Sequence, residues 1–371
     1  MEPMRLFCDV ARNPGKHAAQ WKEDNGGKIV GHFCSYTPEE IITAAGALPF
    51  RILATGGPVS KADTHLQAYS CSLVRGALED ALTGKLDFLD GTVFPHTCDS
   101  IQRLSDIWRM NITNKFHLDV VLPVKLNTES ARTYMVDVLK KFRTELGAKL
   151  AVDVSDEHLR AAAKTYNRIR AGLARLYDIR VKNPGAIGSS DIHTVLKASM
   201  VMDRNRFAGT LEQLLDGLPV TADFTADKKR LVLSGGLCAT PDIYEIIEES
   251  GGAVVWDDFC TGARYFEGMI DEDGDPIGSI AERYLSRVVC PAKHAGVYSR
   301  GQYLLSRVKD LRADGVIFLL LKFCDPHAFD YPYMKAMLER EGVPALLFEI
   351  EDQSSSEGQL RTRCEAFIEM L

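Results

Sequence analysis

Apolar runs of strand-like length alternate with amphipathic helical segments along almost the whole chain. This alternation is typical of a parallel β-sheet whose strands are joined by crossover helices, so the sequence predicts an α/β fold. We expect strands at 28–34, 49–54, within 88–98, and at 118–124, 230–236, 253–256, 315–321 and 344–350. We expect helices at 38–45, 66–82, 99–110, 129–146, 241–250, 279–289, 298–312, 329–341 and from 357 to the end.

The stretch from Asp156 to Leu215 departs from this alternation. It has helical periodicity with several Arg and Lys on the polar face, is broken near 183 and 204–209, and contains no strand-like run. The simplest interpretation of those charges is a solvated face. We therefore predict two Rossmann-like, doubly wound domains with parallel sheets, at 1–150 and 226–371, joined by a helical connector at 151–225.

One helix start carries a local signal. Thr37-Pro-Glu-Glu40 matches a capping box with Pro at the first helical position, so we expect the Glu40 side chain to cap the backbone there. Ser354-Ser-Ser-Glu357 gives a similar signal for the C-terminal helix.

The composition of the chain argues against some classes of binding partner. The net charge of −7 argues against nucleic acid, which is bound by clustered Lys and Arg. No run of 18 or more apolar residues exists, so we expect no membrane partner, and the N-terminal residues lack the apolar region of a secretory signal. Nine cysteines in such a chain favour free thiols, metal ligands or catalytic groups in a reducing cytoplasm over a disulfide framework.

Five of these cysteines follow strand-like runs: Cys34, Cys98, Cys238, Cys260 and Cys324. In parallel α/β sheets, ligands bind outside the carboxyl ends of the strands, so this edge is the expected functional edge. Thiolates select iron–sulfur clusters among other soft metal groups, but a buried free cysteine is also a common core residue, and spacing alone leaves both interpretations open.

Common nucleotide-binding, catalytic and zinc-binding motifs do not decide which ligand, if any, binds at this edge. The sequence has no G-x-x-x-x-G-K-[ST], no G-x-G-x-x-G, no G-x-S-x-G, no H-E-x-x-H and no C-x-x-C. Motif support for ATP, a dinucleotide or zinc is therefore missing. Ser234-Gly-Gly236 fits a plain tight turn better than a phosphate site. Cys98 and Cys324 are each followed by Asp at an expected helix start, where the helix dipole stabilises a thiolate.

Segments spread over nearly the whole chain resemble the 2-hydroxyacyl-CoA dehydratase and benzoyl-CoA reductase family, in particular its iron–sulfur subunits. The matching segments are 31–46, 66–71, 94–99 (Phe-Pro-His-Thr-Cys-Asp), 257–266 (Asp-Asp-Phe-Cys-Thr-Gly-Ala-Arg-Tyr-Phe), 322–325 and 361–369. The resemblance implies two α/β domains with a [4Fe-4S] cluster between them, bound by Cys71, Cys98 and Cys324. It also implies an acyl-CoA substrate, a homologous cluster-bearing partner subunit and a separate ATP-hydrolysing iron–sulfur activator protein.

The implied chemistry is transfer of one low-potential electron to a CoA thioester, giving a ketyl radical. The leading expectation is dehydration of a 2-hydroxyacyl-CoA to a 2-enoyl-CoA. Three alternatives stay open: ATP-dependent reduction of benzoyl-CoA, a non-catalytic electron-relay subunit, and a double-cubane cluster protein. The last would need roughly twice as many thiolate ligands in one chain.

Other residues in the matching segments have less defined roles. Ser35 is expected either to hydrogen-bond the substrate carbonyl or a cluster sulfur, or to make a simple turn contact. Arg264 is expected either to bind a CoA phosphate or to form a structural ion pair. Asp257 and Asp258 would position a base or a neighbouring Arg, or belong to a buried hydrogen-bond network.

For Cys34 and Cys260, a structural role and ligation are equally open. We interpret the remaining cysteines as ordinary thiols, with Cys238 the foremost exception to test: Cys8, Cys238, Cys290 and Cys364.

Overall fold

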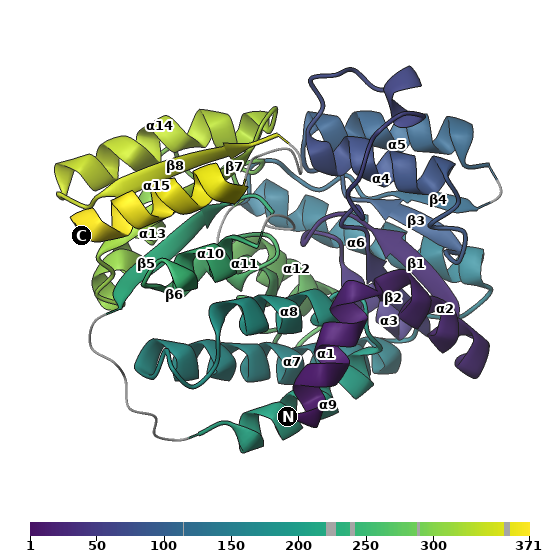
Figure 1. Cartoon of the computed structure of the whole chain (residues 1–371). Coiled ribbons are helices and arrows are strands. Elements are labelled where there is room, and N and C mark those ends of the chain that lie inside the picture. The colour runs from purple at the N-terminus through teal and green to yellow at the C-terminus, as the bar shows by residue number, and fades with distance from the viewer. Residues whose placement is uncertain (114, 220–227, 238–241, 288–289, 352–356) are drawn as a thin grey trace.

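The protein contains two four-stranded, all-parallel β-sheets with helices packed around them (Figure 1). The computed structural model describes residues 1–113, 115–219, 228–237, 242–287, 290–351 and 357–371. The strand order is β2-β1-β3-β4 in the first sheet and β6-β5-β7-β8 in the second, so both sheets follow the same plan. The predicted α/β fold with two parallel sheets is confirmed, whereas the domain boundaries stay a prediction.

The elements follow the predicted alternation closely. The strands are β1 (Lys28–His32), β2 (Ala47–Arg51), β3 (Gly91–Phe94), β4 (Phe116–Asp119), β5 (Lys229–Gly235), β6 (Gly252–Asp258), β7 (Gly315–Leu321) and β8 (Ala345–Ile350). The helices are α1 (Glu2–Arg12), α2 (Pro14–Asn25), α3 (Glu39–Ala44), α4 (Ser72–Leu82), α5 (Asp99–Asn111), α6 (Glu129–Leu150), α7 (Asp156–Lys182), α8 (Ser189–Ser199), α9 (Arg204–Gly217), α10 (Ile243–Glu249), α11 (Ala263–Phe266), α12 (Pro276–Ser286), α13 (Ser299–Asp310), α14 (Asp325–Arg340) and α15 (Glu357–Met370), with a 3₁₀ turn at Ala62–Thr64.

Both faces of each sheet are buried. Ile29 and Val30 are neighbours on β1, yet they belong to different hydrophobic clusters, because successive strand residues point to opposite faces. Val232 and Leu233 on β5 divide in the same way between the two clusters of the second sheet. This is the doubly wound arrangement, in which strands read as continuous apolar runs.

The segment between the sheets is helical, as predicted, and consists of α7, α8 and α9 among the described residues. In Figure 1 these helices lie beneath both sheets. Their basic residues do not all form a solvated face, however, since Arg170, Arg180 and Arg204 are buried. That part of the prediction was wrong because carboxylates from distant segments pair with two of these arginines, a contact that periodicity does not reveal.

The expected capping box at 37–40 does not form. Pro38 is the N-cap of α3 and no side chain caps the helix. Among the described residues, the Thr37 hydroxyl has no hydrogen-bond partner although it is buried. Glu40 instead forms ion pairs with Arg170 and Arg283, because a fully buried carboxylate is stabilised more by cations than by one backbone N–H.

Some boundaries differ from the predictions. The helix expected from residue 66 begins at Ser72, and the N-terminal helices α1 and α2 were not anticipated. Phe7 of α1 contacts Phe207 of α9, with ring centroids 5.3 Å apart. The N-terminal helix α1 therefore packs on the helical layer, by which we mean α7, α8 and α9. Cys238 and the cap at Ser354 lie outside the described residues. None of the described helices is both long enough and apolar enough to cross a membrane.

Candidate functional site

Six cysteines line one cavity of about 90 Å³. It lies where the carboxyl ends of strands from both sheets meet, since its walls include residues that follow β1, β3, β6 and β7. The remaining walls are mainly apolar and include Phe33 and Leu321. The six cysteines are Cys34, Cys71, Cys98, Cys260, Cys290 and Cys324.

The three cysteines expected to bind a cluster share one local geometry. Cys71 is the N-cap of α4, Cys98 the N-cap of α5 and Cys324 the N-cap of α14. Backbone N–H groups of the first turns point at the sulfurs of Cys71 and Cys98. Three helix N-termini therefore converge on the cavity, and their dipoles favour a negatively charged group there.

Burial keeps these thiols protonated. It raises the pKa of Cys98 to about 12, and the neighbouring thiols of Cys71 and Cys34 add to the shift. Burial likewise raises the pKa of Cys324, where Cys71 and Cys98 contribute. Each thiol must lose its proton to bind a metal, so loading a cluster would release protons from this cavity.

Cys34, Cys260 and Cys290 form a second group in the same cavity. A hydrogen bond between the Cys260 and Cys290 thiols holds the pKa of Cys260 well below its usual value and raises that of Cys290. Sequence reasoning missed Cys290 because it follows no strand-like run. Cys364, also interpreted as an ordinary thiol, lies fully buried in the core of the second sheet.

The chemistry of the cavity's donors is that of thiolates, which bind iron–sulfur clusters and other soft metal groups. No three His, Cys, Asp or Glu side chains among the described residues are spaced to hold one metal ion. In a [4Fe-4S] cluster each cysteine binds a different iron, so the sulfurs lie further apart than around one ion. Cys71, Cys98 and Cys324 line one mainly apolar cavity, which is the kind of donor set that such a cluster uses.

Ser35 lies just outside the cavity. It is buried, and its hydroxyl accepts a hydrogen bond of 3.0 Å from the Arg287 guanidinium. That guanidinium also stacks 4.0 Å from the centroid of the Tyr36 ring. A catalytic role for Ser35 stays a prediction, and the observed contact fixes its side chain to a buried cation.

Arg264 is buried in an ion pair with Asp258, with 3.0 Å between Nε and Oδ1. Arg300 approaches the other Asp258 oxygen at 2.6 Å. Binding of CoA by Arg264 stays a prediction. Its Nη2 group also lies 3.5 Å from His327, and His327 Nδ1 lies 3.2 Å from the Cys324 sulfur.

His327 was not anticipated from the sequence. Burial, with the nearby cations of Arg264 and Arg300, holds its pKa well below the usual value, so the ring is neutral. Asp257 accepts hydrogen bonds from the hydroxyls of Tyr177 and Tyr244, each with a contact of 2.8 Å. It thus belongs to a buried hydrogen-bond network.

Comparison with known proteins shows which family shares this sequence. Residues 34–371 match the family model of the 2-hydroxyglutaryl-CoA dehydratase D-component. The chain belongs to this family. It is 30% identical over 365 residues to the (R)-phenyllactyl-CoA dehydratase beta subunit of Clostridium sporogenes, covering 98% of this chain and 97% of the relative. It is 30% identical to the beta subunit of the lactoyl-CoA dehydratase of Anaerotignum propionicum (98% and 97% covered) and 28% identical to a subunit of the benzoyl-CoA reductase of Thauera aromatica (95% and 94% covered).

The D-component match begins at the first cavity cysteine, Cys34, and includes all six. It leaves out α1, α2 and β1. All six cysteines of the cavity therefore lie within the part of the chain that is shared with the family, whereas the cavity residue Phe33 directly precedes it.

Proposed function

We propose that this chain is the [4Fe-4S] subunit of an acyl-CoA dehydratase, which takes a low-potential electron and passes it to a 2-hydroxyacyl-CoA thioester to form a 2-enoyl-CoA. The observation that carries the proposal is the convergence of Cys71, Cys98 and Cys324 as helix N-caps on one cavity. The family match and the dehydratase subunits among its relatives support the substrate class.

The residues around the cavity suit this role. A bound [4Fe-4S] cluster supplies one electron and, with three protein ligands, an iron position open to the substrate. The three N-cap thiolates would hold it, and first-turn N–H groups would stabilise its negative charge. The apolar walls exclude water, which protects a radical from side reactions. Neutral His327, beside the Cys324 sulfur, would orient that ligand.

The decisive experiment is anaerobic purification followed by iron and sulfide analysis. We expect about four irons per chain, and loss of that iron in Cys71→Ala, Cys98→Ala and Cys324→Ala. Cys8→Ala is the matched control, because Cys8 lies on α1 away from the cavity, and it should keep its iron. A colourless, iron-free wild-type protein would contradict the proposal.

Activity assays then distinguish dehydration of a 2-hydroxyacyl-CoA from reduction of benzoyl-CoA. The loaded chain, with a homologous partner subunit, an ATP-hydrolysing activator and ATP, should dehydrate a 2-hydroxyacyl-CoA. Reduction of benzoyl-CoA instead would place the chain with the benzoyl-CoA reductase among its relatives. An electron paramagnetic resonance signal that never responds to any acyl-CoA would indicate a relay subunit. We assign the enzyme to the cytoplasm.

A second candidate, a double-cubane cluster protein, is favoured by one observation. The cavity holds six thiols rather than three, grouped as Cys71, Cys98 and Cys324 beside Cys34, Cys260 and Cys290. Iron analysis decides between the candidates, since a double cubane requires clearly more than about four irons per chain. Cys290→Ala should then lose iron, whereas with a single cluster it should keep all of it.

A further inference from the structure

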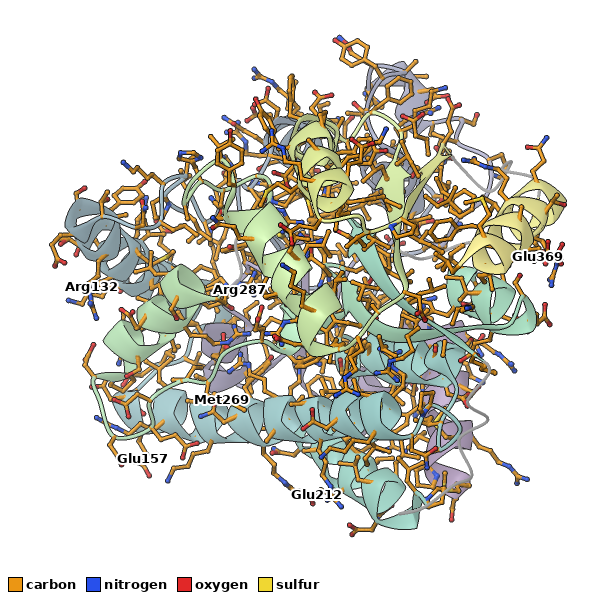
Figure 2. All side chains as sticks on the ribbon, turned by 90° about the vertical axis from the view of Figure 1, so that its left-hand side faces the viewer. Arg132, Glu157, Glu212, Met269, Arg287 and Glu369 are labelled. Carbon is orange, nitrogen blue, oxygen red and sulfur yellow. The ribbon has the colours of Figure 1, made fainter. Side chains whose placement is uncertain are left out.

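A polar cavity of about 360 Å³ lies where α11 and α12 end and α13 begins. Arg287, the C-cap of α12 and labelled in Figure 2, forms part of its wall. None of its described lining residues also lines the thiol cavity, so the two cavities are separate. We call it the arginine cavity.

The charges around the arginine cavity are mainly positive. Arg287, Arg300 and Arg307 line it, and Glu267 is the one carboxylate among its described lining residues. Arg300 is already committed to ion pairs with Asp258 and with a carboxylate of α14. The other two arginines still outnumber the single carboxylate, in a chain whose net charge is −7, so the cavity attracts an anion.

Arg307 is held by aromatic rings rather than by a carboxylate. Its Cζ lies 4.8 Å from the centroid of the Trp256 ring and 5.1 Å from that of Tyr303. The Tyr303 hydroxyl accepts a hydrogen bond of 3.2 Å from the Trp256 indole, which fixes the two rings. Arg307 forms no ion pair with any carboxylate that the structure describes. A guanidinium held by its faces presents its N–H edge to a ligand.

Arg287 is a second cation of the same kind. It is 5% exposed, its guanidinium lies 4.0 Å from the centroid of the Tyr36 ring, and its Nη2 donates to the Ser35 hydroxyl. Within the described part of the chain its Nε has no hydrogen-bond partner. A buried guanidinium that faces no carboxylate is costly, and an external anion would offset that cost.

The start of α13 adds backbone donors to the arginine cavity. The helix has twelve residues, no side chain caps its N-terminus, and Ser299 in its first turn lines the cavity. First-turn N–H groups lack partners within the helix, and the helix dipole favours negative charge at that end.

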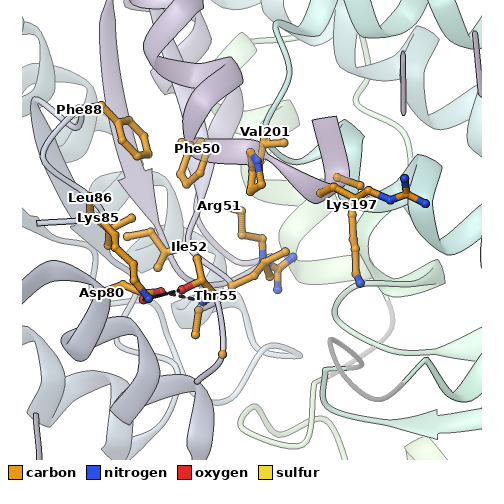
Figure 3. A pocket seen from close by; sticks show the side chains of 17 residues that line it. Phe50, Arg51, Ile52, Thr55, Asp80, Lys85, Leu86, Phe88, Lys197 and Val201 are labelled. Atoms are coloured by element: carbon orange, nitrogen blue, oxygen red, sulfur yellow. Dashed lines mark hydrogen bonds and ion pairs between the residues drawn. The ribbon is translucent and has the colours of Figure 1, made fainter. Parts of the chain in front are cut away.

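The cavity at the carboxyl end of β2 shows how a lining cation is otherwise neutralised (Figure 3). There Lys85 pairs with Asp80 at 2.9 Å, and Asp80 also accepts hydrogen bonds from Thr55. Arg287 and Arg307 have no such carboxylate among the described residues, so the arginine cavity is the better candidate for an anion from solution.

We propose that the arginine cavity binds a small tetrahedral oxyanion, inorganic phosphate. The Arg307 fork binds two of its oxygens, Arg287 supplies the second positive charge, and the start of α13 donates backbone N–H groups. This site goes beyond the proposed function and does not rest on it, because the arginine cavity is separate from the thiols.

The test is calorimetric titration of sodium phosphate into the anaerobically purified full chain, with sodium chloride of equal ionic strength as the blank. Two charge-assisted hydrogen bonds predict a phosphate Kd of about 1 mM or below, rising with salt. Arg307→Gln should raise this Kd by about tenfold or more. Arg307→Lys, which keeps the charge but loses the fork, should give an intermediate Kd.

Arg109→Gln is the matched control, because it removes an exposed arginine of α5 and should leave the phosphate Kd unaltered. No phosphate-specific heat in the wild-type chain, or an unchanged Kd in Arg307→Gln and Arg307→Lys, overturns the proposed site. Iron-free and iron-loaded chains should bind phosphate equally well, so loss of the cluster leaves this inference standing.

A competition titration with CoA tests the independence of the site from the substrate. Phosphate binding that is unchanged by CoA supports the proposal. Displacement of phosphate by CoA, together with equal weakening of CoA and phosphate in Arg307→Gln, would assign the arginine cavity to the substrate and overturn the proposed separate site.

Discussion

Two buried polar regions lie side by side in this protein. In one the polar groups form ion pairs, and in the other they are thiols. Around α3, Glu39 and Glu40 are buried but paired with cations: Arg204 Nη2 lies 2.8 Å from Glu39, and Arg170 contacts Glu40. In the thiol cavity, by contrast, burial raises the pKa of the Cys98 and Cys324 thiols and keeps them neutral, and the nearby Arg51 Nε lacks a hydrogen-bond partner among the described residues.

The paired carboxylates have a structural role, whereas the thiol cavity is the candidate site of the reaction. The paired carboxylates join α3 to α7, α9, α11 and α12 through arginines and the hydroxyls of Tyr166, Tyr265 and Tyr284. They fix the helical layer against the first sheet. Among the described residues the thiol cavity is lined by no carboxylate, and its sulfurs make hydrogen bonds such as those of Cys324 with His327 and of Cys260 with Cys290. Under the proposed function, its thiols bind a cluster.

The largest expected effect comes from breaking the paired region. Glu40→Ala leaves the buried guanidiniums of Arg170 and Arg283 without their carboxylate. Breaking a buried ion pair from one side costs about 3–5 kcal/mol, so the free energy of unfolding should fall by that order. Denaturant titration measures it. A loss below about 1 kcal/mol would contradict the structural role assigned to this pair.

Acid should weaken the same region. Burial, together with Arg51 and Arg204, lowers the pKa of His32 from 6.5 to about 4 although Glu39 opposes the shift. The unfolded chain therefore binds more protons than the native chain in this range, and stability falls as pH drops from 6.5 to 4, by up to about 3 kcal/mol.

Unfolding curves recorded across that range test this prediction. His32→Gln should flatten the pH dependence there, because it removes the titrating group. Glu39 affects stability at lower pH. Burial opposes its ionisation, but His32 and Arg204 lower its pKa from 4.5 to about 2. The stabilisation that ionised Glu39 provides is therefore lost as the pH falls below 4.5. An equally steep curve in His32→Gln would exclude His32 as the cause.

The thiol cavity should behave differently. In iron-free protein, Cys71→Ala removes one sulfur from the cavity wall and should change the free energy of unfolding by only about 1 kcal/mol. In iron-loaded protein the same change should cost much more, since a ligand that binds the native state stabilises it. Parallel unfolding with and without iron measures both values, and equal losses would refute the contrast.

The smallest effect is expected at the surface. Arg168 and Glu212 form an ion pair between α7 and α9, but both are about half exposed. Glu212 lies at the outer edge of the helical layer in Figure 2. Glu212→Ala should cost less than about 1 kcal/mol in denaturant titration. A cost near that of Glu40→Ala would mean that burial does not distinguish the two pairs.

The sequence predicted the sheets well, because doubly buried strands are continuous apolar runs, such as Gly315–Leu321. It predicted Cys98 and Cys324 at helix starts for a local reason, since a strand end and an Asp-led helix flank each. Cys71 follows no strand and came from the family resemblance.

What the sequence did not predict depends on contacts between distant segments. Glu40 has the local pattern of a cap, and only the approach of Arg170, from a helix far along the chain, makes it an ion-pair partner. Cys290 enters the site for the same reason, because folding brings it to the cavity and nothing in its neighbouring residues marks it. His327 differs, since it lies three residues after Cys324 on the first turn of α14, where helical spacing places it beside the Cys324 sulfur.

The shared strand order of the two sheets has a consequence for biosynthesis. Cys98 follows the third strand of the first half, and Cys324 follows the third strand of the second half. A ribosome exposes the first half, with Cys71 and Cys98, long before Cys324 emerges. Under the proposed function, a cluster held by all three can be inserted only after nearly the whole polypeptide has been made, so its delivery would follow translation.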